Sequence, residues 1–318
     1  MQKLARFETA VPAKDSDFLE AVLHGLSLPQ KALPSRFFYD EAGSRLFERI
    51  TELPEYYPTR AEIALLKSCG GGLKEAVPRG AAVVEFGSGS SLKTELLLAA
   101  LDRPSAYVPI DISASALYPA ARRIQQRFPD IAVHPIPGSF DDLDIMKRPF
   151  SGGPSVGFFP GSTIGNLLPA DAVAFLRSAR RYLGRGARFI IGADLQKPLD
   201  TLLPAYDDAQ GITAAFNRNV LVRINRELDG TFKPSLFEHK AVYNSAEGRI
   251  EMHLRASRQH RVSVAGRCFA FREGETIHTE NSHKYTVAGF QALARAGGWK
   301  PVKAWTGQAN LFSVHLLA

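Results

Sequence analysis

The sequence is poor in cysteine and has no long apolar run. Only two cysteines occur in 318 residues, Cys69 and Cys268. Two cysteines so far apart indicate neither a disulfide framework nor a metal cluster, so we expect no metal site and a cytoplasmic location. No stretch approaches the roughly 20 apolar residues that would cross a bilayer. Residues 1–17 lack the apolar centre of a secretory signal, so we expect no membrane partner.

A block of like charge is also missing. Lysine and arginine number 39 against 32 acidic residues, which gives a formal net charge of +7. Such an excess could serve a nucleic-acid partner. However, the basic residues are scattered among the acids, and no basic stripe or stacking motif accompanies them. We therefore predict a solvated basic surface that favours anionic ligands, and no nucleic-acid partner.

The chain contains no internal repeat, and its length suits one large domain or two linked ones. Residues 15–75 show three helix-like stretches, with capping residues at their starts or glycines at their ends. From residue 81 to residue 197, short apolar strands alternate with helical stretches. This alternation predicts a parallel sheet with helices on both faces.

The alternation breaks over residues 198–285. A helix-like segment at 199–224 is followed by β-like runs, and the letters NSAEGR between the first two indicate a hairpin turn. From residue 286, a helix and two final strands follow, joined by the short turn TGQA, which predicts an antiparallel hairpin at the edge of the main sheet. A parallel nucleotide-binding sheet that ends in such a hairpin is typical of class I methyltransferases.

A glycine turn follows the first apolar strand of this region. The run AAVVEF leads into Gly87 and Gly89 and then into a leucine-rich helix. This order places backbone N–H groups and a helix N-terminus at the carboxyl edge of the sheet, where ligands bind. Leu92 stands where a phosphate-binding loop and a dinucleotide fingerprint both need a glycine. S-adenosylmethionine has no pyrophosphate and needs no glycine there, so the turn favours this ligand.

Asp111 ends the next predicted strand. A carboxylate at this position can accept hydrogen bonds from both ribose hydroxyls of an adenosine ligand. The alternative is that Asp111 caps the following helix, although Ser113 could do so instead. We favour the ribose contact.

Five stretches together resemble one family, the histidine-specific N-alpha methyltransferases of ergothioneine biosynthesis. They are FFYDEAGSRLFERITELPEYYPTRAE, EFGSGSSLKTELLL, YVPIDISASAL, FFPGSTIGNL and HTENSHKY, and the resemblance spans nearly the whole chain. It implies a Rossmann-like methyltransferase domain over residues 61–197 and 286–318. It also implies an α+β substrate domain built from residues 1–60 and the insert 198–285. The expected reaction is three methyl transfers from S-adenosylmethionine to the alpha-amine of free histidine, which gives hercynine.

The resemblance also implies the cofactor contacts. They fall on Gly87, Lys93, Asp111, Ser139 and Phe140. The family pattern near the last two usually has an aspartate where this chain has Ser139. A serine accepts one hydrogen bond without charge, so Asp141 is the alternative acceptor for the adenine amine.

The substrate contacts that the resemblance implies are Tyr39, Tyr56, Asn166, Tyr206, Met252, Glu280 and Ser282. The attacking amine must be neutral, and the Asn166 carbonyl could accept one of its hydrogens without favouring protonation, which makes Asn166 the expected catalytic residue. Glu280 and Ser282 could bind both imidazole nitrogens. Met252 would line the ring pocket, although a methionine in a strand is usually part of a core. His283 stands where the family has an aromatic residue, and it either alters the pocket or faces solvent.

Two other functions compete with this one. An enzyme of the same fold could methylate another amino acid, such as tryptophan, but an indole has a single donor and would not use both Glu280 and Ser282. A nucleic-acid-binding protein would explain the net positive charge, but the sequence lacks a basic stripe. We therefore expect a free amino acid as the substrate, with histidine preferred.

Overall fold

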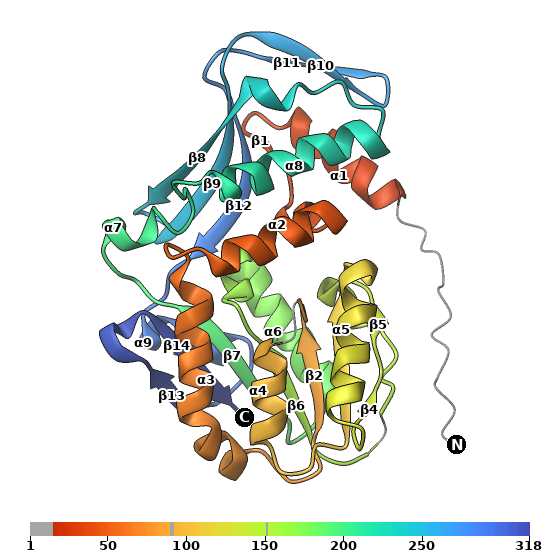
Figure 1. The fold of residues 1–318 in the computed structure, drawn as a ribbon, viewed down its shortest axis with the longest axis vertical. Coiled ribbons are helices and arrows are strands. Elements are labelled where there is room, and N and C mark those ends of the chain that lie inside the picture. The colour runs from red at the N-terminus through yellow and green to blue at the C-terminus, as the bar shows by residue number, and fades with distance from the viewer. Residues whose placement is uncertain (1–14, 90–91, 151) are drawn as a thin grey trace.

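Two sheets lie one above the other along the long axis of the molecule (Figure 1). The computed structural model describes residues 15–89, 92–150 and 152–318. A large, mostly parallel sheet forms the lower unit and a smaller sheet the upper unit. Within the described residues, no helix combines the length and the apolar composition that a membrane crossing needs.

The large sheet has the strand order β13-β14-β7-β6-β2-β3-β4, with β5 beside β3. Its central strands pair in parallel, β14 pairs antiparallel with β7, and β13 pairs antiparallel with β14. The predicted parallel sheet and its terminal hairpin are therefore confirmed. The strands are β2 (Ala82–Phe86), β3 (Ala106–Asp111), β4 (Ala132–Val133), β5 (Ile136–Pro137), β6 (Ser155–Phe159), β7 (Arg188–Asp194), β13 (Pro301–Thr306) and β14 (Phe312–Leu317).

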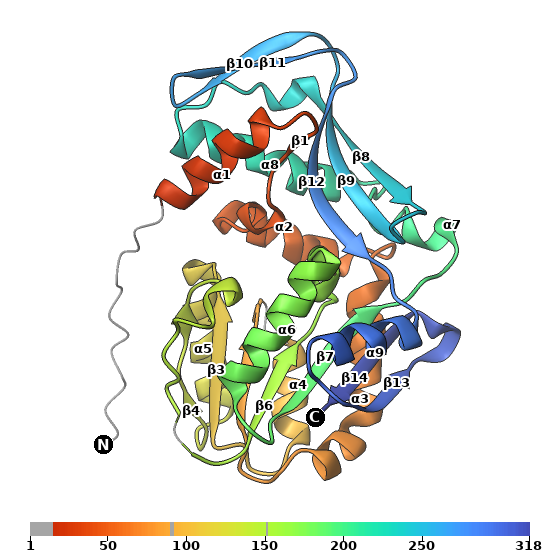
Figure 2. The same cartoon turned by 180° about the vertical axis from the view of Figure 1, so that it is seen from behind.

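Helices cover both faces of this sheet. Residues of β2 and β6 are buried without alternation, as expected for strands that are covered on both sides. One apolar cluster joins the sheet to α3 (Tyr57–Ala76), α4 (Leu92–Ala100) and α5 (Ala114–Arg127). A second cluster on the opposite face joins it to α6 (Pro169–Leu183) and α9 (Val287–Ala296), which lie in front in Figure 2.

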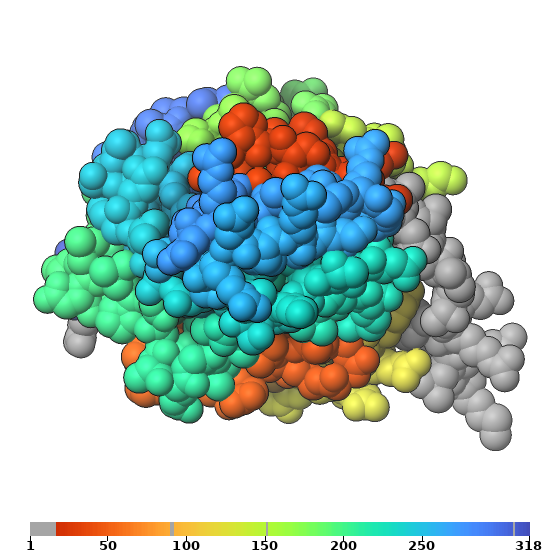
Figure 3. Space-filling model, turned by 90° about the horizontal axis from the view of Figure 1, so that it is seen from above, coloured from red at the N-terminus to blue at the C-terminus, as the bar shows by residue number. Residues whose placement is uncertain are grey.

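The upper unit has its own apolar core, drawn from residues 18–57 and 202–277. Its four-stranded sheet has the order β1-β12-β9-β8. The elements are α1 (Asp15–Ser27), β1 (Lys31–Ala32), α2 (Glu41–Glu52), α7 (Leu199–Leu202), α8 (Ile212–Glu227), β8 (Phe237–Asn244), β9 (Arg249–Ala256), β10 (His260–Val264), β11 (Arg267–Phe271) and β12 (Thr276–His283). Seen from above, α1 and the β10–β11 hairpin form the outer end of this unit (Figure 3). The N-terminal helices and the insert thus share one core, and the domain boundaries at residues 60, 197 and 285 stay a prediction.

Five short 3₁₀ helices complete the described elements. They are η1 (Ser35–Phe38), η2 (Phe140–Asp142), η3 (Thr163–Asn166), η4 (Pro234–Leu236) and η5 (Gln308–Asn310).

The predicted helix-like segment 199–224 is interrupted. Gly211 has a φ of +70°, and the carboxylate of Asp208 accepts hydrogen bonds from Ile212 N (3.0 Å) and Thr213 N (2.7 Å). Asp208 therefore starts α8 as a new helix. The connecting loop carries Tyr206, which is buried.

A β-bulge in β12 changes the face on which its side chains lie. His278 pairs with His253 on β9, but after the bulge Glu280 pairs with Met252. Directly paired residues of antiparallel strands lie on the same face. Glu280 and Ser282 therefore share the inner face with Met252, whereas His278 shares the outer face with His253. The extra residue is Thr279, which is buried and donates its hydroxyl to Met252 O (3.0 Å).

Candidate active site

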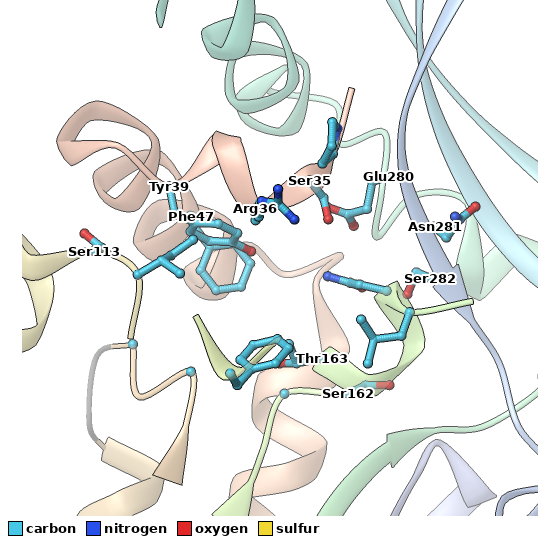
Figure 4. A pocket seen from close by; sticks show the side chains of 18 of the residues that line it. Ser35, Arg36, Tyr39, Phe47, Ser113, Ser162, Thr163, Glu280, Asn281 and Ser282 are labelled. Carbon is cyan, nitrogen blue, oxygen red and sulfur yellow. The ribbon is translucent and has the colours of Figure 1, made fainter. Parts of the chain in front are cut away.

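A pocket of about 630 Å³ lies between the two units. Its lower wall is formed by the carboxyl ends of β2, β3 and β6, and its upper wall by η1, α2 and β12. Figure 4 shows Glu280 and Ser282 reaching into the pocket from one side, with Tyr39 and Phe47 opposite, while Asn281 points away.

The glycine turn opens toward this pocket. Gly87 and Gly89 have φ values of +73° and +46°, a conformation that side chains disfavour. A Cβ added to either glycine would meet no atom within 4 Å, so conformation rather than crowding requires glycine here. Leu92 is 52% exposed at the start of α4, while residues 90–91 of the same turn lie outside the described residues.

Asp111 lines the pocket and also holds the backbone around it. Its carboxylate accepts hydrogen bonds from Gly89 N (3.2 Å) and Ser113 N (2.8 Å). Ser113 is itself the N-cap residue of α5, so this contact fixes the turn before the helix and is not the helix cap of the alternative. The ribose contact of Asp111 stays a prediction.

Lys93 is positioned by an acid that sequence reasoning missed. Its Nζ lies 2.6 Å from Oε2 of Glu62, which is fully buried and also accepts from Gly161 N (2.8 Å). Glu62 lies on the same helical stripe of α3 as the buried Leu65, Leu66 and Cys69. A charged residue in an otherwise apolar stripe was the available signal for it.

Glu85, the acid directly before the glycine turn, is buried at the pocket floor. Tyr107 and Thr94 both donate to its Oε2, the latter at 2.7 Å. Burial raises the pKa of Glu85 to about 8, against the lowering effect of these hydrogen bonds. The carboxyl group is therefore largely protonated at neutral pH in the free protein.

The predicted adenine contacts lie together on η2. Ser139 Oγ donates to Asp141 Oδ2 (3.0 Å) and accepts from Asp141 N (3.1 Å). Arg36 of η1 lies 3.8 Å from the same carboxylate. Phe140 packs against two rings, Phe159 and Phe175, with centroids 5.3 Å away in each case. Ser139, Phe140 and Asp141 all line the pocket, and their contacts with a cofactor stay a prediction.

Six of the seven predicted substrate residues line the pocket: Tyr39, Tyr56, Asn166, Tyr206, Glu280 and Ser282. Met252 does not. It is 2% exposed and packs in the core of the upper unit, on the strand next to Glu280. The structure therefore does not support its predicted contact with the substrate ring.

His283 takes neither of the two positions that the sequence left open. It is buried, outside the pocket lining, and its Nδ1 donates to the carbonyl of Gly165 (2.8 Å). It thus packs behind the loop that carries Asn166 and does not enter the pocket.

Lys284 connects two of the pocket hydroxyls. Its buried Nζ donates to Tyr206 Oη (2.7 Å), Ser282 Oγ (2.8 Å) and Asp194 Oδ2 (2.7 Å). The two hydroxyl oxygens are also 2.8 Å apart. An ammonium has three protons, and all three are used here. Sequence reasoning missed Lys284 because nothing in the local pattern indicates its burial.

Asp194 at the end of β7 balances this charge. Burial alone would raise its pKa, but the neighbouring Lys284 and Lys197 outweigh burial and lower it. Lys197 lies 2.5 Å from Oδ1, and Tyr57 donates to Oδ2 at 2.6 Å. The two lysines and the tyrosine keep one buried carboxylate ionised beneath the pocket.

Two polar side chains are left for a ligand. Within residues 15–89, 92–150 and 152–318, no side chain donates a hydrogen bond to the Glu280 carboxylate or binds the Asn166 amide. Burial raises the pKa of Glu280 to about 7, which Lys284 partly offsets. A buried acceptor without a donor is costly, so Glu280 is ready for a donor from a bound molecule.

Similar known proteins are methyltransferases. A family model described as histidine-specific methyltransferase, SAM-dependent, matches residues 18–318. The histidine N-alpha-methyltransferase of Mycobacterium tuberculosis is 41% identical over 93% of each chain. Ergothioneine biosynthesis protein 1 of Neurospora crassa is 31% identical over 91% of this chain and 33% of its own. A 4-dimethylallyltryptophan N-methyltransferase of Epichloe festucae var. lolii is 30% identical over 58% of this chain and 54% of its own.

Proposed function

The chain belongs to the family of histidine-specific, S-adenosylmethionine-dependent methyltransferases, and from this membership we propose that it methylates the alpha-amine of free L-histidine. The observation that carries the proposal is the pair formed by Glu280 and Ser282. Glu280 offers a carboxylate that no described side chain binds, and Ser282 offers a hydroxyl that accepts a hydrogen bond from Lys284. An imidazole has two ring nitrogens that need such partners.

The residues of the glycine turn fit S-adenosylmethionine, which supplies an electrophilic methyl group on a sulfonium. The open space beside Gly87 and Gly89 admits the amino-acid tail along the backbone. We propose that Lys93 binds the tail carboxylate and that Asp111 accepts the ribose hydroxyls. Ser139, Phe140 and Asp141 would then contact the adenine.

Asn166 prepares the substrate amine in this proposal. The amine attacks through its lone pair, so it must be neutral, and an alpha-amino group has a pKa of about 7.7–8.0 or higher. The Asn166 amide oxygen accepts one N–H and directs the lone pair toward the methyl group, without the charge that would favour protonation. Because this acceptor can hold whichever N–H is left, up to three transfers are possible and the product is hercynine. Rate enhancement then comes largely from alignment of the two reactants.

The substrate carboxylate needs donors without extra charge. Tyr39 and Tyr56 line the pocket, and burial holds the pKa of each well above its usual value. Both hydroxyls therefore stay protonated at any physiological pH. We propose that they donate to the carboxylate of histidine.

One fungal relative is named for a tryptophan derivative, so tryptophan is the alternative substrate to compare with histidine. An indole would leave either Glu280 or Ser282 without a partner, and a site built for hydrogen bonds rejects such a ligand by factors of roughly 10⁴–10⁵ in kcat/KM. The polar pair therefore favours histidine over tryptophan.

Mass spectrometry with labelled S-adenosylmethionine and each of the twenty amino acids tests the proposal. We expect mono-, di- and trimethylhistidine, with phenylalanine and tryptophan nearly inert. Methylation of tryptophan to the same extent as histidine would favour the alternative, an N-methyltransferase that acts on tryptophan. A place in ergothioneine biosynthesis, a cytoplasmic location and the lack of a nucleic-acid partner are part of the same proposal.

A further inference from the structure

Three possible metal ligands gather on β9 and β12. Glu251 and His253 lie on the sheet face opposite Glu280, and the third, His278, also lines the pocket. Glu251 and His253 lie two residues apart on β9, and His278 is directly opposite His253 on β12. One ligand atom from each of the three lies within 4.8 Å of the other two. The two imidazole rings stack, with centroids 4.7 Å apart and 23° between their planes.

The carboxylate of this cluster is held in place by its neighbours. Arg249 and Asn244 both donate to Oε1 of Glu251, at 2.8 Å and 2.9 Å, so that Oε2 faces His253 Nε2 at 3.0 Å. Burial would raise the pKa of Glu251, but these three hydrogen bonds outweigh it and hold the pKa at about 2. Carboxylates that bind metals are commonly oriented by hydrogen bonds of this kind.

Each histidine has a ring nitrogen with a lone pair. His253 Nε2 lies 3.0 Å from Oε2 of Glu251, and its Nδ1 is on the other side of the ring. That Nδ1 is buried and has no hydrogen-bond partner within the described residues. His278 donates from Nε2 to the carbonyl of Glu280 at 3.1 Å, which leaves its own Nδ1 unprotonated.

We propose that Glu251, His253 and His278 bind a divalent transition-metal ion such as Zn²⁺, with water completing the coordination. Two imidazoles and one carboxylate suit zinc and similar ions. Bond lengths of about 2.0–2.1 Å in a tetrahedron place ligand atoms about 3.3 Å apart, so side-chain rotations that close the cluster by at most about 1.5 Å suffice.

This site departs from the expectation of no metal, which rested on the scarcity of cysteine. His278 is more than twenty residues away from Glu251 and His253 in the sequence and meets them only through the antiparallel pairing of β9 with β12. The ion would tie the two strands together immediately before the bulge that carries Glu280. Because Arg249 offsets the charge of Glu251, the site depends mainly on the two histidines.

Metal titration of the full-length, tag-free protein tests the proposal. Zn²⁺ is titrated in competition with a chromogenic chelator, and Co²⁺ is titrated by its visible absorption, which reports the coordination geometry. We expect one equivalent of either ion. The substitutions His253→Gln and His278→Gln should each weaken Zn²⁺ binding by about 10-fold or more. The matched control is His134→Gln, which changes a half-buried histidine outside the cluster and should bind like the wild type.

Thermal melting without metal checks that each variant folds, and Glu251→Gln replaces any histidine variant that does not. Loss of Zn²⁺ and of the Co²⁺ bands in the cluster variants alone supports the site. Binding that survives the double substitution His253→Gln/His278→Gln overturns it, as does a wild type that retains no Zn²⁺ against the chelator.

Discussion

Lys284 sets the direction of two hydroxyl protons in the pocket. Because its three protons go to Tyr206, Ser282 and Asp194, both hydroxyl oxygens accept from it. One hydroxyl proton then lies between Tyr206 and Ser282, and only the other can point at a ligand. If Tyr206 donates to Ser282, then Ser282 donates to an imidazole nitrogen while Glu280 accepts from the other. That arrangement selects a neutral imidazole in a single tautomer.

Replacing this lysine should therefore affect histidine binding and not only stability. Lys284→Met and Lys197→Met each remove one cation from the buried Asp194, so each should destabilise the fold by about 3 kcal/mol. Only Lys284→Met also frees the two hydroxyls, and it should raise KM for histidine by about 10-fold, the value of one hydrogen bond. Denaturant unfolding and steady-state kinetics on both variants measure the two effects. Equal KM values in the two variants would reduce Lys284 to a structural role.

The raised pKa of Glu280 predicts a pH dependence. The pKa of this carboxyl is about 7 in the free protein, so the acceptor form becomes dominant as the pH rises through 7. The kcat/KM for histidine should rise through the same region, in addition to the rise from the substrate amine. In the Glu280→Gln variant, the ionisations of the substrate still change kcat/KM with pH, but residue 280 no longer ionises and contributes no change. The ratio of wild-type to variant kcat/KM should therefore increase between roughly pH 6 and pH 8. A ratio that does not change over this range would remove Glu280 from imidazole binding.

Single residues could be predicted where local pattern carries the chemistry. Gly87, Asp111 and Asn166 follow predicted strands at the edge where ligands bind, and all three line the pocket. Lys284 and Asp194 could not be predicted, because their partners are brought together from distant strands. The resemblance placed Met252 against the substrate ring, but its side chain packs in the core of the upper unit and does not line the pocket.

The bulge in β12 is the element that aims the pocket residues. Without the bulge, Thr279 would pair with Met252 and Glu280 with Glu251, so that each side chain from Glu280 onward would move to the opposite face. Glu280 and Ser282 would then face outward. A strand pattern read from sequence gives no sign of this extra residue.

Insertion of one alanine between Thr279 and Glu280 moves Glu280 from the position opposite Met252 to the position opposite Glu251 on the outer face. This insertion should therefore abolish histidine binding while S-adenosylmethionine still binds, because the cofactor residues belong to the other sheet. The control Thr279→Val keeps the chain length and loses only the hydrogen bond to Met252 O, at a cost of about 1 kcal/mol. Calorimetry with each ligand separates the outcomes. Retained histidine affinity in the insertion variant would show that the pairing of β12 with β9 does not orient these residues.

At the scale of the whole molecule, the pocket belongs to both units. Arg36 of the upper unit faces Asp141 of the lower unit across it, 3.8 Å apart, and the two proposed ligands would share one continuous space. Binding of either ligand should hold the units in the arrangement that the other needs. By linkage, each ligand then changes the affinity of the other by the same factor.

S-adenosylhomocysteine should therefore tighten histidine binding by about fivefold or more, and histidine should tighten S-adenosylhomocysteine binding equally. Isothermal titration in both orders measures the two factors. Affinities that do not depend on the second ligand would mean that the two halves of the pocket are independent.

The layout of the chain was predictable because burial on both faces leaves a clear pattern. Unbroken apolar runs such as β2 and β6 identified the parallel sheet, and the change to alternating strands after residue 198 identified the insert. The interruption before α8 was not predicted, because it depends on one aspartate side chain, Asp208, that caps a new helix. Local patterns thus determine the elements, while their breaks depend on individual side chains.

The position of β14 has a consequence for how the chain folds while it is being translated. This strand lies between β7 and β13, so the open edge of β7 stays unpaired until residues 312–317 have left the ribosome. The insert and the N-terminal helices, whose core ends at residue 277, can associate before that point. The nascent chain would thus hold a finished upper unit beside an incomplete sheet with an exposed apolar edge, a species that invites aggregation. A chaperone that acts during translation would cover this edge of β7.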